Sequence, residues 1–376
     1  MFRNRPMTRL VLSALLAVLP LAVAYAGPPR TAAKAPAVVV TCVTWHGWSD
    51  ALRLSNGVVE AIVVPSIGRV MAFEFVGAPG TNPIFVNKDW TGKSVADADA
   101  ATWAAFGGDK LWPSPQADWI RHNVRAWPPD QAFDGDPEIA RVVPGGIRLI
   151  TPVSTAFAAR AVRVITMKAG QPRLYIAQTI LKDPDAANPA VRAAPPADTD
   201  SAEEQRVARE QRDGFPLGIW SVTQTRGDET VFLPLSKSLT FPEGFAGLDA
   251  APVTTYIAPY FTAEGDILRI LHDPKVGRKV GTSSPEGWIA ALYSGNVVFS
   301  EHYPTPSLGT YPDGGAAAEV YMNPDPSYIE MELLGPVTSL RHGGKVSYDI
   351  YWQLGRLPRV PTSRAEAQAL VQAAVR

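Results

Sequence analysis

Alternating apolar and polar residues dominate the central part of the chain and predict β-strands. The clearest alternation runs from residue 346 to 354, where every second residue is large and apolar. These residues are Val346, Tyr348, Ile350, Trp352 and Leu354. Because successive side chains of a strand point to opposite faces, the five share one face and the residues between them share the other. The segment is therefore expected to be a half-buried strand.

Two pairs of β-rich runs are separated by short turn-forming segments and predict hairpins. Residues 57–65 and 69–76 flank the short segment 66–68. Residues 161–167 and 173–181 flank a segment that contains glycine and proline. Apolar runs of this length with turn residues between them are typical of antiparallel strands. Many strands and little helix predict an all-β fold, a sandwich of antiparallel sheets.

Helical signals are confined to two places. Residues 183–214 are rich in proline, alanine and charge, and we expect an insertion or mobile loop with a short helix over 202–212. Near the end of the chain, Ser363 and Glu366 form a capping box before an alanine-rich segment, which predicts a short C-terminal helix. We expect its apolar face to pack against a sheet. That face comprises Ala367, Leu370 and Val371.

The first residues have the pattern of a secretory signal peptide. Arginines at positions 3, 5 and 9 precede an apolar run over residues 10–23, and a small-x-small motif follows at 24–26. This combination is typical of a cleaved leader. We therefore expect residues 1–26 to be removed and the mature protein to be periplasmic or secreted. No later run is apolar for long enough to span a bilayer. The alternative is that the leader is not cleaved and stays as an N-terminal anchor.

Composition indicates one domain after this leader. We expect a linker over 27–37, a main domain over 38–357 and a helical tail over 358–376. The formal net charge is −1 and 19% of residues are charged, with no basic stripe, which excludes nucleic acid as a partner class. The single cysteine, Cys42, excludes an intramolecular disulfide. Stability must therefore come from a hydrophobic core, which a chain of this size can supply.

One aromatic and charged segment, residues 106–119, points to carbohydrate chemistry. It combines a lysine with two aspartates, an amide, two indoles, a Gly-Gly pair and two prolines. Glycine and proline favour irregular backbone, so we expect a rigid loop rather than a helix. Sugars present C–H faces to aromatic rings and hydroxyls to polar groups, which suits this set. The alternative is a tryptophan-rich loop that only plugs the end of the sandwich.

Five segments resemble, in the same order along the chain, the galactose mutarotase-like superfamily and within it the DUF4380 proteins. They are residues 52–69, 107–116, 217–224, 279–291 and 329–345. The second is similar to the family's GG-x-K-x-W loop, and the third to a central strand whose Trp and Gln point into the site. The last is similar to an acidic strand followed by a proline and a turn. The resemblance implies a supersandwich of antiparallel sheets and a small-molecule carbohydrate as partner.

The resemblance also implies which residues form the site. The implied substrate-binding residues are Asp109, Lys110, Trp112, Gln116, Trp119, Trp220, Gln224 and Lys279. A mutarotase opens a sugar hemiacetal with a carboxylate base and an acid. The acidic strand offers Glu330 and Glu332, which are two residues apart and so face the same side. Glu332 is nearer the following proline and is our first choice. No metal or cofactor is expected.

The acid of a mutarotase has no direct counterpart in this chain. Family members carry one histidine in a His-Gly-Gly segment and another on a central strand, where this sequence has Phe106 and Trp220. His302, in a Glu-His-Tyr segment, is the substitute that we favour, with His122 as the second candidate. Lys110 is a further candidate. The other three histidines are expected to be packed, in turns or solvated.

Several functions follow from this interpretation. The chain is either an exported aldose 1-epimerase-like isomerase or an exported, non-catalytic sugar-binding module; a structural envelope protein is a third reading. Lys110 and Lys279 would also suit a sugar acid such as a uronate. A glycosidase that uses Glu332 with Asp109 is a further alternative. The aspartates within 130–136 lack the full spacing of a calcium loop.

Overall fold

The computed structural model describes residues 37–98, 102–123, 126–182, 210, 214–249, 256, 258–306 and 309–376, without the side chains of residues 122 and 123. Ala35–Arg376 form one compact unit. The expected signal peptide lies outside the described residues, and so does nearly all of the expected insertion with its short helix. These expectations stay predictions.

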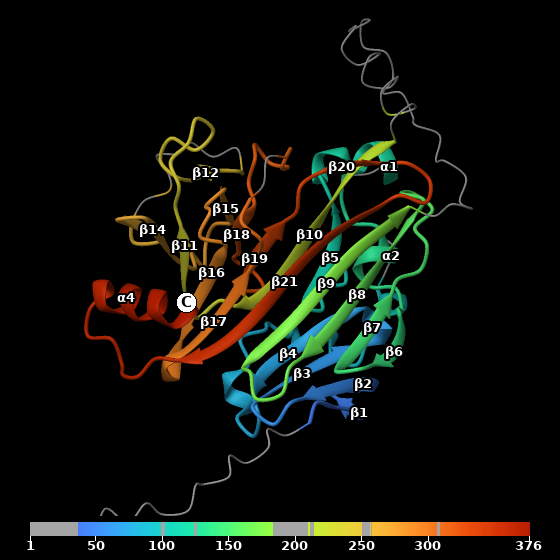
Figure 1. Ribbon diagram of the computed structural model, residues 1–376, viewed down its shortest axis with the longest axis horizontal. Helices are drawn as coiled ribbons and strands as arrows, with labels where there is room; N and C mark the ends of the chain where they lie inside the picture. Colours follow the sequence, from blue (N-terminus) through green and yellow to red (C-terminus); the bar gives the residue numbers. More distant parts are fainter. Residues whose placement is uncertain are drawn as a thin grey trace, which may run out of the picture. The chain divides into compact units, whose positions relative to one another are not determined.

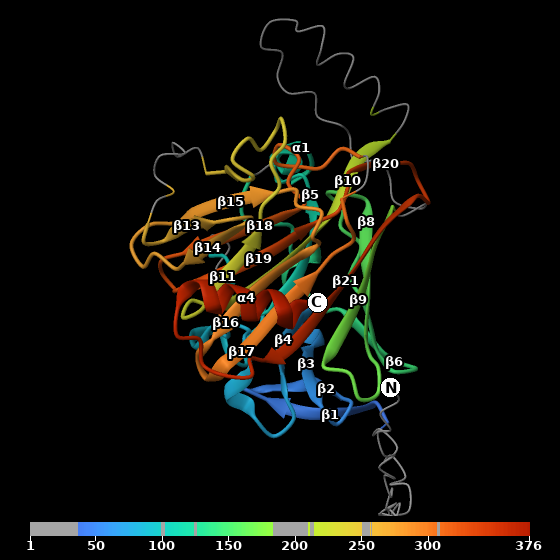
Figure 2. The same cartoon turned by 60° about the vertical axis from the view of Figure 1, so that its left-hand side comes forward.

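Two antiparallel sheets make up the described fold (Figures 1 and 2). The first sheet has the order β1-β2-β3-β4-β5-β10-β19-β18-β15-β12, and β20 pairs with β10 off this path. Its strands are β1 (Val39–Trp45), β2 (Trp48–Ser55), β3 (Val59–Val64), β4 (Arg69–Phe75), β5 (Asp109–Ser114), β10 (Phe215–Arg226), β12 (Ala246–Gly247), β15 (Arg278–Thr282), β18 (Ala318–Asn323), β19 (Tyr328–Leu334) and β20 (Thr338–Leu340).

The second sheet has the order β13-β14-β11-β16-β17-β21-β9-β8-β7-β6. Its strands are β6 (Ile139–Val143), β7 (Gly146–Ile150), β8 (Ala159–Met167), β9 (Arg173–Lys182), β11 (Thr230–Pro234), β13 (Phe261–Glu264), β14 (Ile267–Leu271), β16 (Trp288–Tyr293), β17 (Val297–His302) and β21 (Lys345–Arg356). The predicted all-β sandwich of antiparallel sheets is confirmed.

The main core lies between the two sheets. Phe73 of β4 in the first sheet lies 6.4 Å from Phe299 and 6.0 Å from Trp352 of the second, measured between ring centroids. Along β21 the predicted alternation is confirmed, since all five apolar residues from Val346 to Leu354 are buried. The buried aromatic and aliphatic side chains of both inner faces form one continuous cluster, and burial of this apolar surface is the main stabilising term of the fold.

Both predicted hairpins are present. β3 and β4 are joined by the 3-10 turn η1 (Pro65–Ile67) and by Gly68, whose φ of 62° lies in the left-handed region. β8 and β9 are joined by the predicted turn over residues 168–172. Glycine allows the left-handed backbone of such a turn without steric cost.

Helices are short and few among the described residues. They are α1 (Trp119–Asn123), α2 (Gln131–Asp134), α4 (Arg364–Val375) and the 3-10 turns η2 (Pro79–Thr81), η3 (Lys88–Trp90), η4 (Val95–Asp97), η5 (Gln116–Asp118) and η7 (Ser294–Asn296). α4 is the predicted C-terminal helix. The Ser363 hydroxyl accepts a hydrogen bond from the Glu366 amide at 3.2 Å. Val371 is buried among apolar residues of β11, β14, β16 and β17, and α4 lies beside the second sheet (Figure 2).

The expected loop over 106–119 is wrong in its central part, because residues 109–114 form strand β5. Gly107 and Gly108 have φ of 91° and 77° and lie against the Phe85 carbonyl and Met71. A side chain at either position would clash, so the glycines let the chain enter the sheet here. Within the strand, proline is tolerated because β5 pairs with β4 only at Asp109, which leaves that edge open.

Candidate functional site

Five neighbouring strands of the first sheet, β5, β10, β19, β18 and β15, bring the candidate residues onto one face. The register places Trp112 opposite Trp220. It also places Gln224 opposite Glu330. Residues paired across strands point the same way. The members of this surface, which we call the site face, are Lys110, Trp112, Trp220, Gln224, Lys279, Glu319, Tyr321, Glu330 and Glu332.

The site face points away from the second sheet. Asp109 lies on the opposite, inner face of the first sheet. Its carboxylate binds Arg163 of β8 at 2.9 Å, on the inner side of the first sheet. The hydroxyls of Ser221 and Thr223 donate to the same carboxylate at 3.3 and 3.2 Å. Asp109 was expected to bind substrate; it instead links the two sheets in the buried interior. The cause is strand alternation, which turns Asp109 inward when Lys110 points outward.

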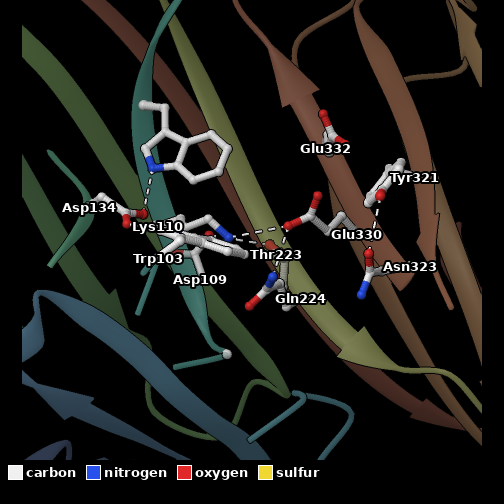
Figure 3. A network of polar contacts seen from close by, with 12 residues as sticks. Trp103, Asp109, Lys110, Asp134, Thr223, Gln224, Tyr321, Asn323, Glu330 and Glu332 are labelled. Atoms are coloured by element: carbon white, nitrogen blue, oxygen red, sulfur yellow. Dashed lines mark hydrogen bonds and ion pairs between the residues drawn. The ribbon is translucent and has the colours of Figure 1, made fainter. Parts of the chain in front are cut away.

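Lys110 and Glu330 form the centre of the site face (Figure 3). Lys110 Nζ lies 3.3 Å from Glu330 Oε1, and Gln224 Nε2 donates to the same oxygen at 3.0 Å. The Glu330 side chain is 9% exposed, whereas Lys110 is 1% exposed. Glu330 Oε2 makes no hydrogen bond with the described residues. One oxygen of this carboxylate is therefore fixed by two donors, and the other has no donor among the described residues.

Burial changes the acid-base behaviour of Lys110. Removal from water disfavours the ammonium and lowers the pKa of Lys110, and the charge of Glu330 offsets this only in part. Arg69, which is buried nearby, lowers the pKa further. A lysine in this environment gives up its proton more readily than an exposed lysine, which suits a general acid.

Lys279 forms a second ionic cluster on the same face. Its Nζ lies 2.7 Å from Glu319 Oε2 and 2.9 Å from Glu332 Oε2. The Trp220 indole N–H donates to Glu332 Oε2 at 2.7 Å, and Lys279 Nζ lies 4.5 Å from the centroid of the Trp220 ring. Burial lowers the pKa of Lys279, but Glu332 and Glu319 raise it by more, so the pKa stands above its ordinary value. The ammonium is therefore retained.

A group of indoles lies beside these clusters. Trp112 is 5.2 Å from Trp220 and Trp103 is 5.1 Å from Trp127, between ring centroids. Trp112 and Trp220 are buried, whereas Trp127 is 45% exposed. Trp119 is buried among them and donates its indole N–H to the Pro113 carbonyl at 2.8 Å. The exposed indole in this group is thus Trp127, and the predicted stacking residues mainly support it.

Asp134 holds two of these indoles in place. Its Oδ1 accepts from Trp112 Nε1 at 2.9 Å, and its Oδ2 accepts from Trp103 Nε1 at 2.6 Å (Figure 3). The buried Arg69 neutralises this carboxylate at 3.0 Å. The sequence had shown Asp134 only as part of an incomplete calcium loop. Its contacts join segments far apart in the chain, and no local pattern indicates them.

His302 does not join the site face. It lies on β17 in the second sheet, opposite Tyr351, and its ring stacks on Tyr351 at 4.3 Å. Burial lowers the pKa of His302 to about 4, so it is neutral at ordinary pH. This contradicts the expectation that His302 supplies the acid. The error arose because a sequence segment does not reveal which of two stacked sheets a strand joins.

The remaining candidates lie at the margins. Gln116 begins η5, directly after β5, and is half-buried without a contact to the ionic clusters. His122 lies in α1, and its side chain is outside the described part of the structure. The His272 ring lies 2.7 Å from the backbone carbonyl of Asn323, at the end of β18. Neither Gln116 nor His272 supplies an acid for the site, and the role of His122 stays a prediction.

Two residues of the site face were not predicted from the sequence. Glu319 and Tyr321 alternate with the buried Val320 and Met322 along β18. A period-2 pattern of this kind predicts a strand with one polar face. The signal was therefore present in residues 318–323, but it was short and was not recognised.

Within the described ranges, no group of three or more His, Cys, Asp or Glu side chains is arranged to hold a metal ion. No described helix is long and apolar enough to cross a membrane.

Comparison with solved structures identifies the fold. A galactose mutarotase-like protein from Lactobacillus casei has a TM-score of 0.50 at 10% identity, over 81% of this chain and 100% of that chain. The fold is galactose mutarotase-like. A proposed aldose 1-epimerase from Klebsiella pneumoniae also gives a TM-score of 0.50 at 10% identity, over 89% of this chain and 86% of that chain. No protein-family model and no curated protein matches the sequence, so the resemblance to DUF4380 proteins stays a prediction.

Proposed function

We propose that this protein is exported and binds a carbohydrate on the site face of its galactose mutarotase-like fold. The observation that carries the proposal is the state of Glu330. One oxygen of its carboxylate is held by Lys110 and Gln224, and the other has no hydrogen bond with the described residues. An oriented carboxylate oxygen beside indole rings is suited to a sugar hydroxyl, with Trp127 in reach of the sugar's C–H face.

A neutral sugar fits this surface better than a sugar acid. Lys110 is paired with Glu330, and Lys279 is shared by Glu319 and Glu332. Neither ammonium is left for a ligand carboxylate, and an anion would meet Glu330 directly. Like charges brought together in a poorly solvated site cost free energy. The ligand class we propose is therefore a neutral aldose or polyol.

A second candidate function is anomer interconversion at the same site. It is favoured by the contact between Lys110, whose pKa is lowered, and Glu330. Glu330 would take the proton of the anomeric hydroxyl, and Lys110 would protonate the ring oxygen as the C–O bond breaks to give the open-chain aldehyde. Reclosure on the other carbonyl face returns both protons. Glu330 replaces Glu332 as the base we favour, because Glu332 Oε2 is held by Lys279 and by the Trp220 indole N–H, and its Oε1 is buried.

The test is a calorimetric titration with a sugar panel. Mature protein is titrated with glucose, galactose, glucuronate and galacturonate, and exchange between anomers is followed by NMR. We expect a neutral aldose to bind and Glu330→Gln to weaken it at least roughly tenfold, the loss of one charge-assisted hydrogen bond. Glu60→Gln, on β3 outside the clusters, is the control. Binding of uronates alone, or of no sugar, contradicts the proposal.

Export has its own test. The proposal of a cleaved leader is supported by the arginines and the apolar run of the first residues. N-terminal sequencing of protein from the cell envelope or the medium should give a chain that begins near Gly27. A full-length chain retained with the cells contradicts cleavage.

A further inference from the structure

Two buried carboxylates on the site face have only one cation between them. Glu319 of β18 stands directly opposite Glu332 of β19, and both side chains are at most 1% exposed. Side chains in this position have Cβ atoms about 4.5–5.5 Å apart. Lys279 Nζ contacts one oxygen of each, at 2.7 and 2.9 Å. The remaining oxygens, Oε1 of both residues, are buried and accept no hydrogen bond from the described residues.

The surroundings of the pair add further negative charge. Glu330 acts on Glu332 from the same strand, and Asp313 acts on Glu319. Asp249 lies behind Lys279, where its carboxylate accepts the Lys279 backbone N–H at 3.2 Å. Tyr321 also faces these groups and is neutral, because burial raises its pKa. Two ionised carboxylates here would leave a buried negative charge without compensation, which is strongly unfavourable.

We propose that Glu319 and Glu332 share one proton and that the protonated pair is a positioning element, which holds Lys279 on the face of Trp220. The proton would lie between the two paired carboxyl groups, and Lys279 would bridge their Oε2 atoms. One proton and one ammonium then balance the charge of the two carboxylates. Like-charged carboxylates that share a site commonly retain one proton in this way.

The direction of the titration agrees with this geometry. Burial raises the pKa of Glu319 well above its ordinary value, and Lys279 offsets the effect only in part. Burial likewise raises the pKa of Glu332, again with partial compensation by Lys279. The two groups titrate as a pair, so the raised value belongs to the shared proton rather than to one residue.

The pair of carboxyl groups can influence the rest of the site face through Trp220. Glu332 accepts the Trp220 indole N–H at 2.7 Å, and the Trp220 ring packs on Trp112 at 5.2 Å. Trp112 in turn lies under Lys110, 4.6 Å from its Nζ. Loss of the shared proton would add charge beside Trp220 and disturb this stack. The link to ligand affinity rests on the proposed function, whereas the shared proton does not.

The proton is tested by carboxyl-carbon NMR on mature protein labelled at glutamate Cδ. Other buried glutamates also titrate above the ordinary value of 4.5, among them Glu229, whose pKa burial raises to about 8, and Glu138, whose pKa burial raises to about 7. We expect one further high titration, which belongs to the pair and is absent in Glu319→Gln and in Glu332→Gln. Glu229→Gln is the matched control, because Glu229 is also buried but its pKa responds to Asp228 and Arg226 rather than to the pair. It should lose its own titration and leave that of the pair unchanged. Ordinary midpoints for both carboxyls overturn the proposal. If the variants do not fold, through-bond NMR assigns the Glu319 and Glu332 signals in the wild type, and their titrations decide it.

Sugar affinity against pH separates this inference from the proposed function. The affinity of the wild type for the neutral sugar that binds tightest should fall as pH rises through the titration of the pair. If sugar binding raises the pKa of the pair by one unit, the affinity falls by roughly tenfold. Affinity of Glu319→Gln, which mimics the protonated acid, should not depend on pH in that range. Equal profiles overturn the positioning role. Absence of sugar binding overturns the proposed function, while the NMR titration still decides the shared proton.

Discussion

At the scale of single residues, the site face depends on two buried lysines, each paired with a glutamate. Lys110 and Lys279 each lie over an indole ring and each contact a glutamate. Removal from water disfavours both ammonium groups, and the carboxylates make their burial tolerable. Such pairs add little net stability over an apolar substitute, but removal of one partner leaves the other uncompensated. The replacement of one partner of such a pair should therefore destabilise the protein more than the replacement of both.

The first prediction concerns Lys110→Met. The methionine fills the space of the lysine stem but leaves Glu330 without its cation, and we expect a loss of about 3 kcal/mol in the free energy of unfolding. The double variant Lys110→Met with Glu330→Gln should recover most of this loss, because no charge is left unpaired. Urea unfolding of the wild type and of the two variants measures both effects. A double variant as unstable as Lys110→Met alone would show that the pair is not the cause.

The second prediction concerns Glu229, which follows β10. Burial raises its pKa to about 8, from an ordinary value of 4.5, although the Thr225 hydroxyl donates to it at 2.6 Å. The folded protein then binds a proton that the unfolded chain releases. The free energy of unfolding should therefore fall as pH rises from about 4.5 to 8, by at most about 5 kcal/mol from this group.

Glu229→Gln isolates that contribution. The difference in unfolding free energy between the variant and the wild type should grow in favour of the variant as pH rises over the same range. The exposed Glu243→Gln serves as control and should show no such trend. A difference that does not change with pH would mean that Glu229 is ionised in the folded state.

At the scale of elements, the sequence predicts strands where alternation is long and fails where turn residues obscure it. The alternation over 346–354 predicted β21, and the β-rich runs before and after residues 66–68 predicted β3 and β4. The short strand β5 contains Pro113 and is followed by Pro115, and these prolines led to the prediction of a loop. It is a strand because Gly107 and Gly108 adopt positive φ and admit the chain beside β4. That requirement is tertiary and cannot be seen in the local sequence.

The third prediction tests the close approach of Gly107 to the Phe85 carbonyl, just before β5. Gly107→Ala places a Cβ against the Phe85 carbonyl at a φ of 91°, so we expect a loss of about 3 kcal/mol or more and weaker sugar binding. Gly265→Ala is the matched control, because its φ is 61° with open space around the added Cβ. It should cost only about 1–2 kcal/mol, the backbone strain alone. Thermal unfolding compares them, and equal losses would refute the role of the close approach.

At the scale of the molecule, the sandwich explains why the site could be only partly predicted. The sequence predicted Lys110, Gln224, Lys279, Glu330 and Glu332 as site residues, and five neighbouring strands place them on one face. Asp109 and His302 were misplaced, because alternation turns the first inward and strand order puts the second in the other sheet. Strand order across a sheet depends on pairings between distant segments. A single sequence carries little trace of those pairings.

The most direct test of the account is an NMR titration of the tryptophan indole N–H signals with the neutral sugar that binds tightest. If the site face binds the ligand, the signals of Trp103 and Trp127 should shift with saturation. Those of Trp48, on β2, and Trp352, between the sheets, should not move. Saturable shifts at Trp48 with none at Trp103 and Trp127, or no saturable shift with any neutral sugar, would contradict the account.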